Sequence, residues 1–143
     1  MDESSFRTVL IATLLVPQIA ALASSLWFGE RLREFAARHK AIETQDDLLA
    51  YKRLVAGQMY AALIQIVLLA SPPFIFIVGT MVREISTSDL GFILLPSCFV
   101  FFVSMRYKAL ESRIQNLPTG TSDIRQERDH VNEVWVSKPF PDW

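Results

Sequence analysis

Prolines and small polar side chains interrupt three uncharged stretches of the sequence, residues 8–29, 54–82 and 90–105. A proline inside a helix lacks a backbone N–H, so the carbonyl four residues earlier loses its hydrogen bond and needs another partner. We interpret the polar residues nearby mainly as partners for such carbonyls or as links between helices. The alternative is a polar cavity that holds a lipid, quinone, pigment or peptide. The candidates for that cavity are Gln18, Gln65, Ser71, Pro72, Pro73 and Ser97.

Residue types that perform catalysis or bind metals are sparse. His39 and His130 are the two histidines, and neither has a second histidine or a cysteine at ligand spacing. Cys98 is the single cysteine, so it cannot form an internal disulfide or a thiolate metal site alone. Glycine-rich phosphate loops, nucleophile elbows and HExxH patterns are lacking in the sequence. We therefore predict no catalytic, cofactor-binding or metal residues and a non-enzymatic protein.

The charges exclude further classes of protein. The chain has 14 basic and 15 acidic residues and an isoelectric point of about 6.1, which does not favour nucleic-acid binding. The three uncharged stretches have no ionisable group of the kind that ion-coupled transport requires, and no histidine that could ligate a haem. We therefore expect neither an ion-driven transporter nor a cytochrome.

The uncharged stretches themselves predict a membrane protein. Hydrophobic residues make up 51% of the 143 residues. A helix needs about 20 apolar residues to cross a bilayer core, and the first two stretches meet this length. The third is short but gains length if residues 85–88 are added, and the alternative is a re-entrant segment. We predict three proline-kinked transmembrane helices.

The distribution of basic residues predicts the orientation in the membrane. Six basic residues lie between the first two stretches and six follow the third, whereas only Arg7 and Arg83 lie on the other side. The positive-inside rule then places the N-terminus outside and the C-terminus in the cytoplasm. Small size and a plain topology suggest the cytoplasmic (inner) membrane of a bacterium.

The segments outside the bilayer also have helical patterns. The pattern of residues from about 30 to 53 predicts a cytoplasmic helical hairpin. Its second arm starts at Thr44, and Asp47 three residues later completes a variant of the capping box. Residues 124–135 form an amphipathic pattern, and an extended tail with two prolines and two aromatic residues follows. We divide the chain into a membrane domain with its hairpin, 1–118, and a linker, helix and tail, 119–143.

These features predict an all-α integral membrane protein with a cytoplasmic hairpin and a C-terminal amphipathic helix. We expect a structural or accessory subunit or scaffold, which self-associates or joins a larger membrane complex. A small homo-oligomeric channel or carrier, and an accessory subunit that binds lipid, quinone or pigment, are the alternatives. Besides the lipid bilayer, the expected contacts of the chain are with copies of itself or with other subunits. The candidate interaction residues are Phe35, His39, Trp135, Phe140 and Trp143.

Overall fold

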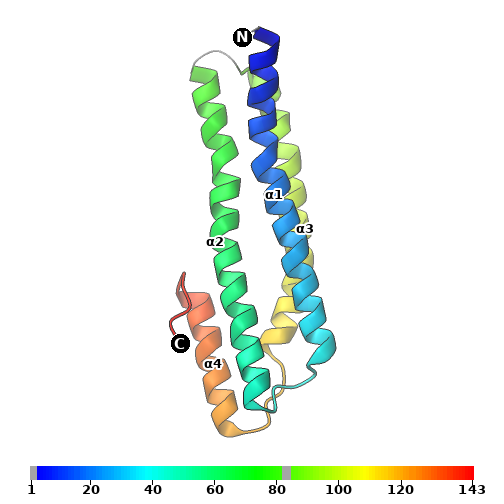
Figure 1. Ribbon diagram of the computed structural model, residues 1–143, viewed down its shortest axis with the longest axis vertical. Coiled ribbons are helices and arrows are strands. Elements are labelled where there is room, and N and C mark those ends of the chain that lie inside the picture. Colours follow the sequence, from blue (N-terminus) through cyan, green and yellow to red (C-terminus); the bar gives the residue numbers. More distant parts are fainter. Residues whose placement is uncertain (1–2, 82–84) are drawn as a thin grey trace. The chain divides into compact units, whose positions relative to one another are not determined.

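The computed structural model describes residues 3–81 and 85–143, without the side chains of residues 3–7 and Thr87. Arg83, one of the two basic residues predicted to lie outside, is therefore not among the described residues. The described chain is helical, which confirms the predicted all-α class. Its elements, in chain order (Figure 1), are α1 Glu3–Arg38, α2 Gln45–Met81, the short 3-10 helix η1 Thr87–Leu90, α3 Gly91–Gln115 and α4 Ser122–Ser137.

Three helical segments are long and apolar enough to cross a membrane, as predicted. They are Thr8–Arg38, Gln45–Met81 and Ser88–Gln115. The third is 28 residues long, because η1 and the charged residues after Met105 extend the short apolar stretch in the sequence. The chain is thus consistent with a multi-pass membrane protein.

Packing groups the helices into two compact units. Unit 1 is formed by Met1–Leu26 and Ile64–Ser104, and unit 2 by Trp27–Leu63 and Met105–Trp143. Each unit therefore takes parts of α1, α2 and α3, and unit 2 also contains α4. We keep the division at residue 118 as a prediction, because these units group segments by packing and not by order along the chain.

Unit 1 is a small three-helix bundle. Its hydrogen bonds join residue 18 to residue 97 and residue 25 to residue 104, so α1 and α3 run parallel. Residue 25 also lies against residue 65, and Leu10 and Leu14 share a cluster with Ile75 and Phe76, so α2 runs antiparallel to α1. Few side chains of this unit are buried, and its exposed surface is rich in large apolar residues. Such a surface is suited to lipid.

Unit 2 has a larger core, to which α4 contributes. The apolar face predicted for this helix is buried at Ile124, Val131 and Val134. These residues pack into one cluster with the ends of α1 and α3 and the start of α2. The other buried members of this cluster are Leu32, Phe35, Ile42, Leu48, Tyr51, Val55, Met59 and Ile114. The C-terminal helix therefore packs against the two arms of the hairpin.

The turn between α1 and α2 has the predicted capping box. Thr44 Oγ1 accepts a hydrogen bond from the Asp47 backbone N–H at 3.1 Å, and Asp47 Oδ2 accepts one from the Thr44 backbone N–H at 3.0 Å. These reciprocal bonds satisfy donors that a helix start leaves without partners.

The sequence did not predict that this turn pairs with the linker before α4. The Ile42 N–H donates to the Pro118 carbonyl at 2.8 Å, and the Gly120 N–H donates to the Ile42 carbonyl at 3.1 Å. A Cβ on Gly120 would lie 3.3 Å from the backbone of Glu43, so this approach favours glycine. The two loops of unit 2 are thereby joined into one end of the unit.

Candidate functional site

Gln18 is the most deeply buried polar side chain of unit 1, with 1% of its surface exposed. Its Nε2 donates to the Leu14 carbonyl at 2.9 Å and to the Phe92 carbonyl at 3.1 Å, and its Oε1 accepts from Ser97 Oγ at 3.0 Å. The Phe92 carbonyl is the one that Pro96 deprives of its helical partner. Gln18 therefore satisfies this carbonyl and links α1 to α3.

A second polar contact involves Gln65 of α2. Its Nε2 donates to Ser25 Oγ at 3.0 Å and lies 3.4 Å from Ser24 Oγ. Ser25 Oγ in turn donates to the Ala21 carbonyl at 3.0 Å and lies 3.4 Å from Ser104 Oγ. This chain of hydrogen bonds joins all three helices of unit 1.

The remaining cavity candidates lie around the proline pair of α2. Ser71 Oγ donates to the Leu68 carbonyl at 3.0 Å, which is the carbonyl that Pro72 leaves without a helical donor. Pro72 is buried and Pro73 is exposed. Among the six candidates, a hydrogen bond joins Gln18 and Ser97, whereas Gln65 and Ser71 bond to residues outside this set. These polar groups act as links and as caps for freed carbonyls.

Ionisable groups suited to catalysis are not grouped in the described parts of the chain. The described residues contain no cluster of three or more His, Cys, Asp or Glu side chains that could hold a metal ion. Cys98 is exposed and forms no disulfide.

Unit 2 has a groove lined by residues of α1, α3 and the segments that follow them. It has a volume of about 510 Å³ and lies where the end of α1 and the residues after it face the end of α3. Apolar side chains and two basic groups, Lys40 and Arg113, line it. The complete lining is Ala36, His39, Lys40, Leu110, Arg113, Ile114, Asn116, Leu117 and Pro118.

His39 is the one interaction residue predicted from the sequence that lines this groove. Its ring stacks on Phe35 with centres 4.4 Å apart, and its Nε2 lies 3.4 Å from Asp47 Oδ1. Hydrogen bonds from Thr44 hold the pKa of the Asp47 carboxyl below its usual value, so this carboxylate is charged at neutral pH. Asp47 lies at the start of α2, before the uncharged stretch. His39 is thus fixed on both sides at the edge of the groove.

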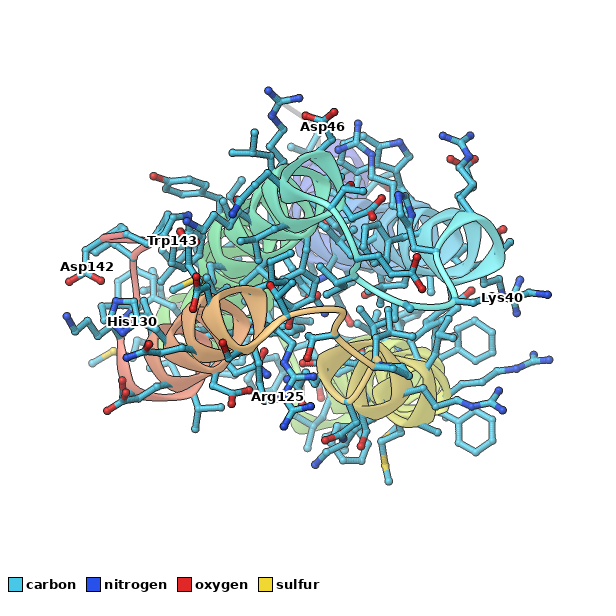
Figure 2. The ribbon with its side chains drawn as sticks, turned by 90° about the horizontal axis from the view of Figure 1, so that it is seen from below. Lys40, Asp46, Arg125, His130, Asp142 and Trp143 are labelled. Carbon is cyan, nitrogen blue, oxygen red and sulfur yellow. The ribbon has the colours of Figure 1, made fainter. Side chains whose placement is uncertain are left out.

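The other predicted interaction residues have different surroundings. Phe35 is buried in the core of unit 2, and Trp135 and Trp143 pack against that core. Phe140 is 56% exposed, and its ring centre lies 6.5 Å from that of Tyr60. Figure 2 shows Trp143 on the opposite side of unit 2 from Lys40. The tail and the groove are therefore separate surfaces.

The polar side of α4 lines a second hollow, of about 570 Å³. All of its lining residues belong to this helix, so it is an open surface and not an enclosed site. His130 lies here (Figure 2), among Ser122, Arg125, Gln126, Asp129 and Glu133.

Polar contacts that hold α4 in place were not predicted from the sequence. The Tyr51 hydroxyl donates to Asn132 Oδ1, and Asn132 Nδ2 donates to the Gln115 carbonyl at 3.2 Å. Arg128 Nη1 donates to the Leu117 carbonyl at 2.5 Å. Asn132 and Arg128 therefore supply partners for carbonyls at the C-terminal end of α3. The signal in the sequence is the presence of side-chain donors on α4, which can bind the free carbonyls at the end of a preceding helix.

Comparisons of the chain with family models, curated proteins and solved structures find no match.

Proposed function

We propose that this chain is a non-enzymatic accessory subunit of a larger membrane complex, and that the groove of unit 2 binds an acidic amphipathic helix of another subunit. The observation that carries the proposal is the combination of an apolar floor with two basic groups in that groove. No ion pair within the described residues involves Lys40 or Arg113. Acidic side chains on a bound helix would supply the missing counter-charges.

The groove favours a helix as its occupant because unit 2 already binds one in a comparable way. α4 packs against α2 and α3 with an apolar face, and polar contacts such as the Lys52–Glu127 ion pair lie beside it. The groove between the ends of α1 and α3 has the same construction and is not covered by any described element. A helix with apolar residues at spacings of three and four would cover its floor.

The distance of the groove from the uncharged stretch of α1 favours a protein over a lipid as its occupant. His39 lies ten residues beyond Gly29, where the first uncharged stretch ends. At about 1.5 Å per residue this is about 15 Å, whereas the headgroup layer adds only about 5 to 8 Å to each side of the core. The end of the groove at His39 and Lys40 therefore lies beyond the lipid headgroups.

The polar residues of the spans support an accessory role more than a channel. Gln18 is buried inside the bundle and hydrogen bonded to both α1 and α3. A pore between copies of the chain requires polar groups on the outer surface of each bundle, and Gln18 is not there. Gln65 is also engaged, with Ser25.

We further propose that both loops of unit 2 and the C-terminus lie in the cytoplasm and the N-terminus outside, in a bacterial cytoplasmic membrane. Twelve of the 14 basic residues lie in or next to the segments assigned to the cytoplasm. Reporter fusions at residue 143 and after residue 42 test this orientation. Activity of a periplasmic reporter at either point would contradict it.

Site-specific photocrosslinking tests the proposed partner. A photoreactive residue in place of Leu110, in the groove, is expected to crosslink to another subunit through an acidic helical segment identified by mass spectrometry. The same residue at Gln126 on α4 is the control and should not give this product. Lys40→Glu with Arg113→Glu should abolish the crosslink, and Arg125→Glu should leave it. If the Lys40→Glu, Arg113→Glu double variant crosslinks as well as the Arg125→Glu variant, the proposal is contradicted.

A further inference from the structure

The C-terminal end of unit 2 presents exposed apolar side chains. Val136 is 82% exposed and Phe140 is 56% exposed. The two charged residues of the tail, Lys138 and Asp142, form an ion pair with each other. The segment after Glu133 therefore has apolar surface and side-chain charges that cancel, a combination that favours a partly apolar environment.

The direction of α4 carries this segment toward the membrane. Lys52 of α2 pairs with Glu127, and Tyr60, further along α2, contacts Phe140. Residue numbers thus rise together in the two helices, so α4 runs parallel to α2 (Figure 1). Because α2 leads from its charged start into its uncharged stretch, the end of α4 and the tail follow it in that direction.

Two helices give independent positions for the edge of the bilayer core. In α1, residues 8–29 extend over about 33 Å, so a core of about 30 Å ends close to Phe28. In α2, residues 54–81 extend over about 42 Å, so a core centred on them begins close to Gln58. Within unit 2, a Cβ on Gly57 would lie 3.6 Å from the Phe28 ring. The two estimates therefore give the same level.

Tyr60 lies close to this level, and Phe140 contacts it. Tyr60 is three residues beyond Gly57, or about 4.5 Å deeper along α2. Its ring is half exposed, and Trp27 at a similar level has Arg31 4.1 Å from its ring centre. Aromatic rings with basic neighbours are typical of the boundary between the hydrocarbon core and the headgroups. The tail therefore reaches the membrane boundary.

We infer that residues 134–143 are an interfacial anchor, in which Val136 and Phe140 insert among phospholipids at the boundary between headgroups and acyl chains. Phospholipid is the occupant because the exposed side chains are apolar and lie at its level, and because the two charged side chains of the tail neutralise each other. The inference depends on the spans crossing a bilayer, as in the proposed function, but not on the groove or its partner.

Spin-label accessibility in phosphatidylcholine nanodiscs tests the anchor on the full chain. The starting variant is Cys98→Ala, which removes the only cysteine. Single cysteines then replace Val136 or Phe140, with Gln126 on the charged side of α4 as the aqueous control and Phe101, exposed on α3, as the reference for lipid. Collisions with oxygen report contact with acyl chains, and collisions with a water-soluble nickel complex report contact with solvent.

The anchor predicts an oxygen-to-nickel ratio at residues 136 and 140 several-fold higher than at residue 126 and close to that at residue 101. A ratio equal to that at residue 126 would overturn it. Low collision rates with both reagents would also overturn it, because the tail would then be covered by protein. A low oxygen signal at residue 101 as well would contradict the spans themselves, whereas a high signal there would confine the failure to the anchor.

Discussion

At the residue scale, two polar side chains of unit 1, Gln18 and Ser71, are explained by the prolines. Gln18 donates to the Phe92 carbonyl, which Pro96 frees, and Ser71 donates to the Leu68 carbonyl, which Pro72 frees. In hydrocarbon such carbonyls have no water to bind, so a nearby side-chain donor is required. The sequence predicted this use for the polar residues, but not which donor serves which carbonyl, because that depends on how the helices are rotated.

A double-mutant cycle tests the link between Gln18 and Pro96. Gln18→Leu should lower the free energy of unfolding by about 1 kcal/mol, because the Phe92 carbonyl and Ser97 each lose a partner. In a Pro96→Ala background the new Ala N–H can donate to the Phe92 carbonyl, so the same change should cost less. Steric trapping in bicelles measures both values. Equal costs in the two backgrounds would show that Gln18 does not serve this carbonyl.

The two glycines that face aromatic rings in unit 2 form a matched pair. A Cβ on Gly29 would overlap ring atoms of Tyr107, whereas a Cβ on Gly57 would make an ordinary contact with Phe28. Gly29→Ala should therefore destabilise the protein by about 1 to 3 kcal/mol. Gly57→Ala should be neutral or stabilising by up to about 1 kcal/mol, because alanine favours helix. Thermal unfolding in detergent compares the two variants.

Tyr107→Leu is the control for the glycine pair. It removes the ring that the new methyl group would meet, so Gly29→Ala should cost less in this background. An undiminished cost would mean that the clash is not with Tyr107.

At the scale of elements, the patterns that the sequence contains were sufficient to predict the helices. The uncharged stretches, the capping box at Thr44 and the apolar spacing in α4 each depend on residues close together in the chain. The pairing of Ile42 with Pro118 and the contact of Tyr51 with Asn132 join residues about 80 positions apart. Local patterns do not encode such contacts, and neither do they show that Lys40 and Arg113 border one groove.

Two valines of α4 test how this helix is held. Val131 is fully buried, and its replacement by alanine should destabilise the docked helix by about 2 kcal/mol through lost apolar burial. Val136→Ala removes the same atoms from an exposed position and should leave docking unchanged. Hydrogen exchange of the backbone amides of residues 122–137 measures the difference. Similar exchange in both variants would contradict the packing of Val131 in the core.

At the scale of the whole molecule, the polar groups that link the helices are different from the residues that are free to contact other molecules. Gln18, Gln65, Ser71 and Ser97 of the candidate spans are engaged in hydrogen bonds, and the described residues form no metal cluster. The basic groove and the exposed apolar residues are the surfaces left for other molecules. This division fits the proposed role of an accessory subunit in a membrane complex.

The mass of the native assembly, extracted in mild detergent and measured with its components identified, tests this account most directly. We predict an assembly that contains a different subunit with an acidic amphipathic helix, and we predict that Lys40→Glu with Arg113→Glu releases that subunit while Arg125→Glu retains it. An assembly made only of copies of this chain, unchanged by the groove variants, would contradict the accessory role and favour the homo-oligomeric channel.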